Sequence, residues 1–198
     1  NTNDAISVIQ TAEGALNEVN GLLTRMRELS VQAANGGTMT STERSYIDQE
    51  FQLLESEINR IVSVTEFNGQ KLIDGAISSG VDFQVGMNNT ANDRIALSVA
   101  DSDSTALGLN DDVLTSQTGA QAAIDALDTA IQSVATARGT LGATQNRLTI
   151  TRNINGNITI DDLLTIVYKF FNYQIFIYIL KYLICKIHSG QNTIIFHQ

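Results

Sequence analysis

Apolar residues recur at intervals of three and four along three stretches of the chain, which is the spacing of one helix face. The first stretch predicts a helix over about 3–34, and a single polar residue, Ser30, interrupts its face. The apolar positions are Ile9, Ala12, Leu16, Val19, Leu23, Met26 and Ala33. A flanking row widens the face, so we expect this helix to be buried against more than one neighbour. That row consists of Val8, Ala15, Leu22 and Leu29.

A second helix is predicted over about 41–63, antiparallel to the first. Asn35-Gly36-Gly37 ends the first helix and lets the chain reverse, and Thr40-Ser41-Thr42-Glu43 fits a capping box for the next one. Its apolar face consists of Ile47, Phe51, Leu54, Ile58 and Ile61. At about 1.5 Å per residue the first helix alone would be roughly 48 Å long, which indicates a rod.

The period changes over about 67–100. Asn68-Gly69 and Asp74-Gly75 are turn dipeptides, and residues 81–85 and 95–99 approach the two-residue alternation of half-buried strands. Residues 86–93 would join these strands as a hairpin. We expect this small sheet to pack on the helix pair, since an isolated hairpin is barely stable.

A third helix is predicted over about 118–152, with Thr118 and Gln121 as its capping box. Its apolar face consists of Ala120, Ile124, Leu127, Ile131, Val134, Leu141 and Leu148. Arg138 and Gln145 are polar members of the same row, and Gly139 and Gly142 each weaken the helix by about 1 kcal/mol relative to alanine. The predicted fold is therefore mainly α: a long antiparallel rod of three long helices with a small β-hairpin region.

The amino-acid composition changes sharply after Arg152, which suggests that residues 1–152 form one domain and residues 153–198 a separate segment. The second part has no alanine, and more than half of it is Ile, Phe, Tyr, Asn and Lys. Three interpretations stay open for this atypical apolar tail: aberrant translation of AT-rich sequence outside the normal frame, a divergent helix, or a membrane segment. Lys169, Lys181 and Lys186 interrupt its apolar run, so spanning a membrane is the least favoured of the three.

Charge and residue content argue against several functions. The formal net charge is −9, so a nucleic-acid partner is not expected. The single cysteine, Cys185, excludes an internal disulfide framework, and both histidines, His188 and His197, lie near the end of the chain. We therefore predict no catalytic, cofactor-binding or metal site. The acidic pairs Asp101/Asp103 and Asp111/Asp112 lack the glycine and distal glutamate of a calcium loop and are interpreted as solvated carboxylates.

The periodicity alone also fits a helical adaptor or coiled-coil interaction protein. The predicted hairpin within 81–99 argues against this class of protein, because a pure coiled coil contains no β-hairpin.

Four segments, in this order along the chain, resemble the signature segments of bacterial flagellin. They are Ile9–Leu16 (IQTAEGAL), Met26–Ala33 (MRELSVQA), Thr65–Leu72 (TEFNGQKL) and Leu141–Leu148 (LGATQNRL). The resemblance covers about three quarters of the chain and implies a secreted, extracellular, non-enzymatic subunit of the flagellar filament that assembles with other flagellin subunits. It also implies a minimal rod domain, because the connection from Leu107 to about Gln117 leaves no room for outer domains.

The chain departs from the family pattern at both ends. The family's first helix would precede Asn1, and residues 153–160 read NINGNITI where an Asn-Leu-rich helix is expected. Those terminal helices supply the innermost filament contacts and the region bound by the export chaperone. The altered tail therefore argues against binding of that chaperone.

Two sets of contact residues follow from the resemblance. Loops around 35–42 and 68–75 are assigned to assembly between subunits, although Asn-Gly turns also simply reverse a chain. The candidate subunit contacts are Asn68, Gly69, Gln145, Asn146 and Arg147. Recognition by the flagellin-sensing Toll-like receptor is implied at Arg25, Leu29 and Glu50, with Thr24 where receptor-active relatives often have Gln. In that interpretation Arg25 makes charge-assisted bonds and Leu29 fills a pocket on the partner; a solvated ion pair is the alternative.

Overall fold

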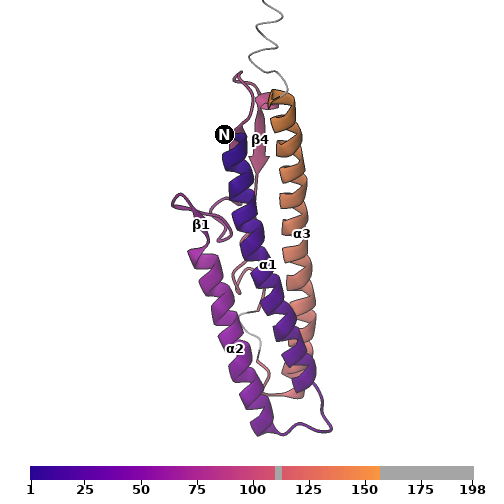
Figure 1. Ribbon diagram of the computed structural model, residues 1–198. Coiled ribbons are helices and arrows are strands. Elements are labelled where there is room, and N and C mark those ends of the chain that lie inside the picture. The colour runs from indigo at the N-terminus through magenta and orange to yellow at the C-terminus, as the bar shows by residue number, and fades with distance from the viewer. Residues whose placement is uncertain (110–112, 157–198) are drawn as a thin grey trace, which may run out of the picture. The chain divides into compact units, whose positions relative to one another are not determined.

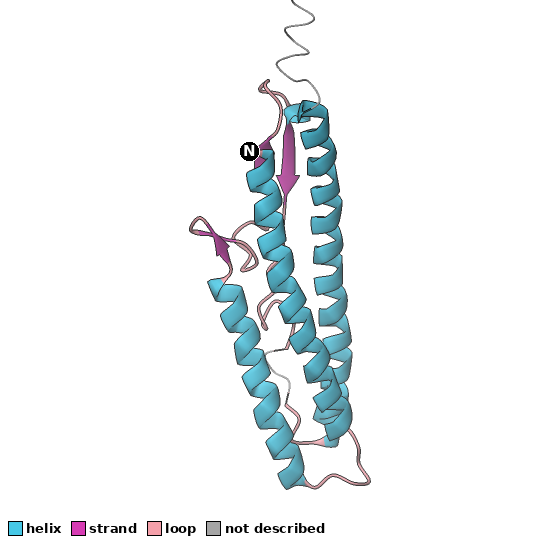
Figure 2. Ribbon diagram, in the orientation of Figure 1, coloured by secondary structure: helices cyan, strands magenta, loops and turns pink. Residues whose placement is uncertain are grey.

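The computed structural model describes residues 1–109 and 113–156, and residues 1–152 form one compact unit. Its framework is three long helices, with α1 lying between α2 and α3 (Figure 1). The remaining described segments are two short antiparallel hairpins, a single 3₁₀ turn at Ala91–Asp93, and the loops that join them (Figure 2). The predicted fold class, a mainly α antiparallel rod with a small β-hairpin region, is confirmed. The interpretations of the atypical tail concern residues that lie outside the described part.

Helix α1 spans Thr2–Ala33 and α2 spans Ser41–Val64. The capping box of α2 is present: the Thr40 hydroxyl accepts the Glu43 backbone N–H at 3.3 Å, and the Glu43 carboxylate accepts the Thr40 N–H at 2.8 Å. The Thr40 amide is the largest influence that lowers the pKa of Glu43, followed by the Thr40 hydroxyl. The boundary predicted from four residues is therefore fixed by two reciprocal bonds.

The C-terminal end of α1 is capped by a residue that the sequence did not suggest. Arg44, in the first turn of α2, donates from Nε to the carbonyl oxygen of Ala33 at 2.8 Å and from Nη2 to that of Asn35 at 3.1 Å. A cation satisfies carbonyls that have no partner within the helix and lies at the negative end of the helix dipole. These two bonds link the start of α2 to the end of α1 and stabilise the loop that reverses the chain.

The short strands form two separate pairs. Strands β1 (Glu66–Phe67) and β2 (Gln70–Lys71) flank the Asn68-Gly69 turn, and β3 (Val81–Gln84) pairs with β4 (Arg94–Leu97) with Val81 opposite Leu97. The predicted hairpin is present, although its second strand begins and ends earlier than 95–99. Beyond Leu97 no residue of β3 remains to pair, and the Val99 N–H instead donates to the Ile77 carbonyl at 3.4 Å.

Helix α3 spans Gln117–Gly156, so it continues past the expected end at residue 152. Its N-terminal cap is Ser116, whose hydroxyl accepts the Gly119 N–H at 3.0 Å, and the expectation of a cap at Thr118 is wrong.

The connection that precedes α3 is held against α2 by side-chain hydrogen bonds. Asp48 accepts the Leu114 N–H at 2.7 Å, and the Asn59 side chain makes two 2.9 Å bonds to Ser104.

The predicted row of α1 forms the centre of the core, whereas the predicted rows of α2 and α3 are buried only in part. Every apolar member of the main row of α1 from Ile9 to Ala33 is fully buried, and so is Ser30, whose hydroxyl donates to the Met26 carbonyl at 2.9 Å.

On α3, Ile124 and Ile131 are half-buried, and Ala123 and Ala130 lie in the core in their place, because the face that packs against α1 is rotated from the predicted one. From α3 the core receives Ala120, Ala123, Leu127, Ala130, Val134, Leu141 and Leu148. The one buried side-chain polar atom without a partner among the described residues is Arg138 Nε, at a polar position of that row.

Candidate interaction surface

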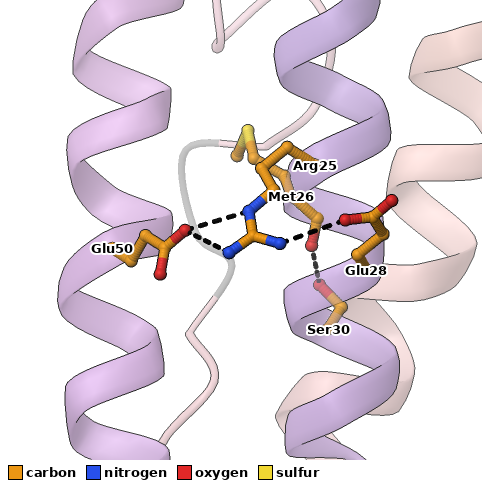
Figure 3. A network of polar contacts seen from close by, with 5 residues as sticks. All are labelled: Arg25, Met26, Glu28, Ser30 and Glu50. Carbon is orange, nitrogen blue, oxygen red and sulfur yellow. Dashed lines mark hydrogen bonds and ion pairs between the residues drawn. The ribbon is translucent and has the colours of Figure 1, made fainter.

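Arg25 joins the exposed sides of α1 and α2. Its Nε and Nη2 donate to one oxygen of Glu50 at 3.0 and 2.7 Å, and its Nη1 donates to Glu28 at 3.1 Å (Figure 3). The bonds to Glu50 and then to Glu28 are the main influences that raise the pKa of Arg25. Because all three side chains are about half exposed or more, solvent screens these pairs and they contribute little to the stability of the fold.

Leu29 does not belong to this exposed surface. Its side chain is only 2 % exposed and lies in the core with the main row of α1. The expectation that Leu29 fills a pocket on a partner therefore does not fit this geometry, because the residue is already packed within its own chain. Thr24 is exposed, and its hydroxyl donates to the Asn20 carbonyl at 2.8 Å.

A second ion pair connects α1 with α3. Arg27 donates from Nε to Asp128 Oδ1 at 2.6 Å and from Nη2 to Oδ2 at 3.3 Å. This fork raises the pKa of Arg27 and lowers the pKa of Asp128, in each case mainly through the hydrogen bonds between them. The two residues are 101 positions apart, so nothing in the local sequence pattern could have paired them.

Asn68 and Gly69 occupy the tight turn between β1 and β2. Both have positive φ, at 50° and 78°, which a two-residue hairpin turn of this kind requires. An ion pair of 2.7 Å between Lys71 and Glu66 closes the hairpin behind the turn. The turn chemistry thus accounts for both residues without a partner, and their assignment as subunit contacts stays a prediction.

The other candidate contacts lie on α3. Gln145 is half-buried, whereas Asn146 and Arg147 are exposed. Figure 1 shows β1 and α3 on opposite sides of α1, so the two groups of candidate contacts are not brought together.

Arg147 lines a groove between the second hairpin and α3. The groove holds about 270 Å³. Its lining includes Asn92, Arg94 and Arg147 together with the apolar Val85, Ile95 and Ile150.

The described carboxylates form no metal site. Asp101 accepts the Asp103 N–H at 3.1 Å, and Asp103 accepts the Ala106 N–H at 2.6 Å. Both carboxylates therefore accept hydrogen bonds from backbone amides of their own loop. Within residues 1–109 and 113–156 no group of three or more His, Cys, Asp or Glu side chains is placed to hold a metal ion. Asp111 and Asp112 lie outside the described residues. In the same part of the chain, no helix is long and apolar enough to cross a membrane.

Comparison with known proteins points to one family. The profile of the bacterial flagellin N-terminal helical region matches residues 1–78. A flagellin of Halalkalibacterium halodurans is 44 % identical over 148 residues, covering 75 % of this chain and 54 % of that protein. A flagellin of Bacillus subtilis is 38 % identical over 185 residues, covering 77 % and 60 %. The chain thus spans a little over half the length of these relatives.

Solved structures agree with the sequence relatives. The crystal structure of Bacillus cereus flagellin matches with a TM-score of 0.67 and 30 % identity, covering 84 % of this chain and 93 % of that one. The structure of FliC from Burkholderia pseudomallei shares the fold, with a TM-score of 0.59 at 20 % identity.

Proposed function

The chain belongs to the bacterial flagellin family, and from that premise we propose that it is a structural, non-enzymatic subunit of the extracellular flagellar filament. The observation that carries the proposal is the match along nearly the whole of the Bacillus cereus flagellin structure. The long helices support it, since a subunit built from packed rods presents extended flanks to its neighbours. The rival role of a helical adaptor or coiled-coil protein does not account for the two β-hairpins.

Assembly would use different surfaces on successive copies. A contact between two unlike surfaces does not close on itself and generates an open helical array. The β1–β2 hairpin and α3 lie on opposite sides of α1 (Figure 1), so they offer unlike surfaces. The candidate contacts Asn68 and Gly69 belong to the hairpin, and Asn146 and Arg147 belong to α3. The chain is then a homopolymer subunit that acts outside the cell.

A motility assay tests this role. The gene for this chain is expressed in a bacterium from which its own flagellin genes have been deleted, and filaments are sought by electron microscopy together with swimming in soft agar. Filaments that label with an antibody to this chain support the proposal. A chain that is exported, recovered folded from the medium and absent from any filament contradicts it.

Recognition by the flagellin-sensing Toll-like receptor is the finer part of the proposal, and it rests on the exposed Arg25 and Glu50, with Thr24 beside them. We expect Arg25→Ala to reduce receptor activation in a reporter cell line without lowering Tm. Arg60→Ala is the matched control, because Arg60 is a comparably exposed arginine that pairs with Glu57 at 2.6 Å on α2. Equal activation by wild type and Arg25→Ala would refute this assignment.

A further inference from the structure

Five of the nine Lys and Arg side chains of residues 1–152 are bound to carboxylates or to backbone carbonyls of the described residues. Arg25, Arg27, Arg60 and Lys71 each pair with a carboxylate at 3.1 Å or less, and Arg44 is bound to two carbonyls. The cations near the second hairpin differ. Arg94 donates to the neutral amide oxygens of Gln84 and Asn89, and within the described residues Arg147 forms no ion pair.

The surroundings of these two arginines also hold few anions. From Thr129 to Arg152, α3 contains three arginines and no carboxylate. The carboxylate of the hairpin turn, Asp93, is bound to the Thr90 hydroxyl at 2.5 Å, and Asp82 of β3 is the other acidic residue of this hairpin. Arg94 and Arg147 line one groove with three aliphatic side chains, and one of these, Ile150, is 60 % exposed. We call this the basic groove.

An opposite surface lies where the connection before α3 runs along α2. Asp48 and Glu55 are two helical turns apart on α2, and the bonds from Asn59 to Ser104 hold Asp101 and Asp103 beside the same helix. Three of these four carboxylates accept hydrogen bonds from backbone amides: Asp48, Asp101 and Asp103. None of the four forms an ion pair with a cation among the described residues. We call Asp48, Glu55, Asp101 and Asp103 the acidic seam.

We propose that the basic groove of one copy binds the acidic seam of a second copy. This inference rests on the proposed self-assembly and names the surfaces that meet. The two surfaces are complementary in charge, and guanidinium groups bind carboxylates through forked, charge-assisted bonds. In Figure 1, β4 lies beside the C-terminal part of α3, whereas α2 lies on the other side of α1, so one chain cannot bring its own groove and seam together. The contact joins unlike surfaces and is therefore head-to-tail.

Charge reversal in the full chain tests the pairing. Self-association is measured by sedimentation velocity over a range of protein concentration and salt for wild type, Arg147→Glu, Glu55→Arg and the double variant. Arg152→Glu and Glu18→Arg are the matched controls, because each makes the same charge change at an exposed residue outside the groove and the seam. Circular dichroism and Tm show that every variant is folded.

We expect each single reversal to weaken association by about tenfold and the double variant to recover most of that loss, while the controls stay within about twofold of wild type. Wild-type association should also weaken at high salt, since ions screen exposed charges. Several outcomes overturn the pairing. They are single variants that associate like wild type, a double variant weaker than both singles, and an effect of Arg147→Glu without one of Glu55→Arg. A wild-type chain that stays monomeric at all concentrations overturns the proposed self-assembly and this contact with it.

Discussion

Replacing Leu29 with alanine should destabilise the fold, because this side chain belongs to the core and not to an exposed recognition surface. Leu29 lies on the flanking row near the C-terminal end of α1, and it is 2 % exposed. Buried Leu→Ala substitutions cost about 2.7–5 kcal/mol through lost transfer free energy and the cavity left behind. The better helix propensity of alanine returns only a few tenths of a kcal/mol. We therefore expect a loss of about 3 kcal/mol in the free energy of unfolding.

For a unit of this size each kcal/mol lowers Tm by about 2–4 °C, so Leu29→Ala should melt about 6–12 °C below wild type in a thermal scan followed by circular dichroism. Arg25→Ala, one turn earlier, is the control. It removes ion pairs that are about half exposed and screened by solvent, so its Tm should stay close to that of wild type. A Leu29→Ala protein that melts within 2 °C of wild type would refute the burial of Leu29, and a loss of receptor activation in that variant could then be attributed to recognition.

Other predictions concern caps, glycines and pH. Thr40→Ala removes the capping box of α2 and should cost about 1 kcal/mol by urea denaturation, with no loss disproving the role of the cap. Gly119→Ala should be destabilising because a Cβ would lie 2.4 Å from the Val113 carbonyl oxygen; Gly139→Ala, whose Cβ would meet nothing, should stabilise by up to about 1 kcal/mol, and equal Tm values would contradict this contrast. Arg27 lowers the pKa of Asp128, so the stabilisation from their pair is present above the unfolded pKa of aspartate and is lost as pH falls through the lower folded value. Asp128→Asn should therefore flatten the acid side of the Tm-against-pH curve, and an unchanged curve would count against the pair.

Local patterns in the sequence were sufficient for the existence of the three helices and for the main buried row of α1. The spacing of three and four identified the buried row of α1 because a helix face is a property of neighbouring residues. The same holds for the Thr40–Glu43 box, whose two bonds join residues three positions apart. The hairpin was predictable because alternation and turn residues are also local signals.

Contacts between distant segments were not predictable from these patterns. Leu29 lies on a flanking row, and only the packing of a further segment decides that such a row is buried. Arg27–Asp128 and Asp48–Leu114 depend on which helix faces meet, and no periodicity encodes that choice. At the start of α3, Ser116 and Thr118 are both residue types that can cap a helix. The hydrogen bond from the Gly119 N–H to the Ser116 hydroxyl shows that Ser116 is the cap.

Seeded growth tests the central claim most directly, namely that this flagellin-family chain assembles with copies of itself into a filament. The purified full chain is mixed with short flagellar filament fragments, and the pelleted fraction and filament length are measured by sedimentation and electron microscopy. The account predicts that filaments lengthen, and that chains enter the pellet only when seeds are present. Folded protein that stays in the supernatant while the seeds keep their original length would contradict it.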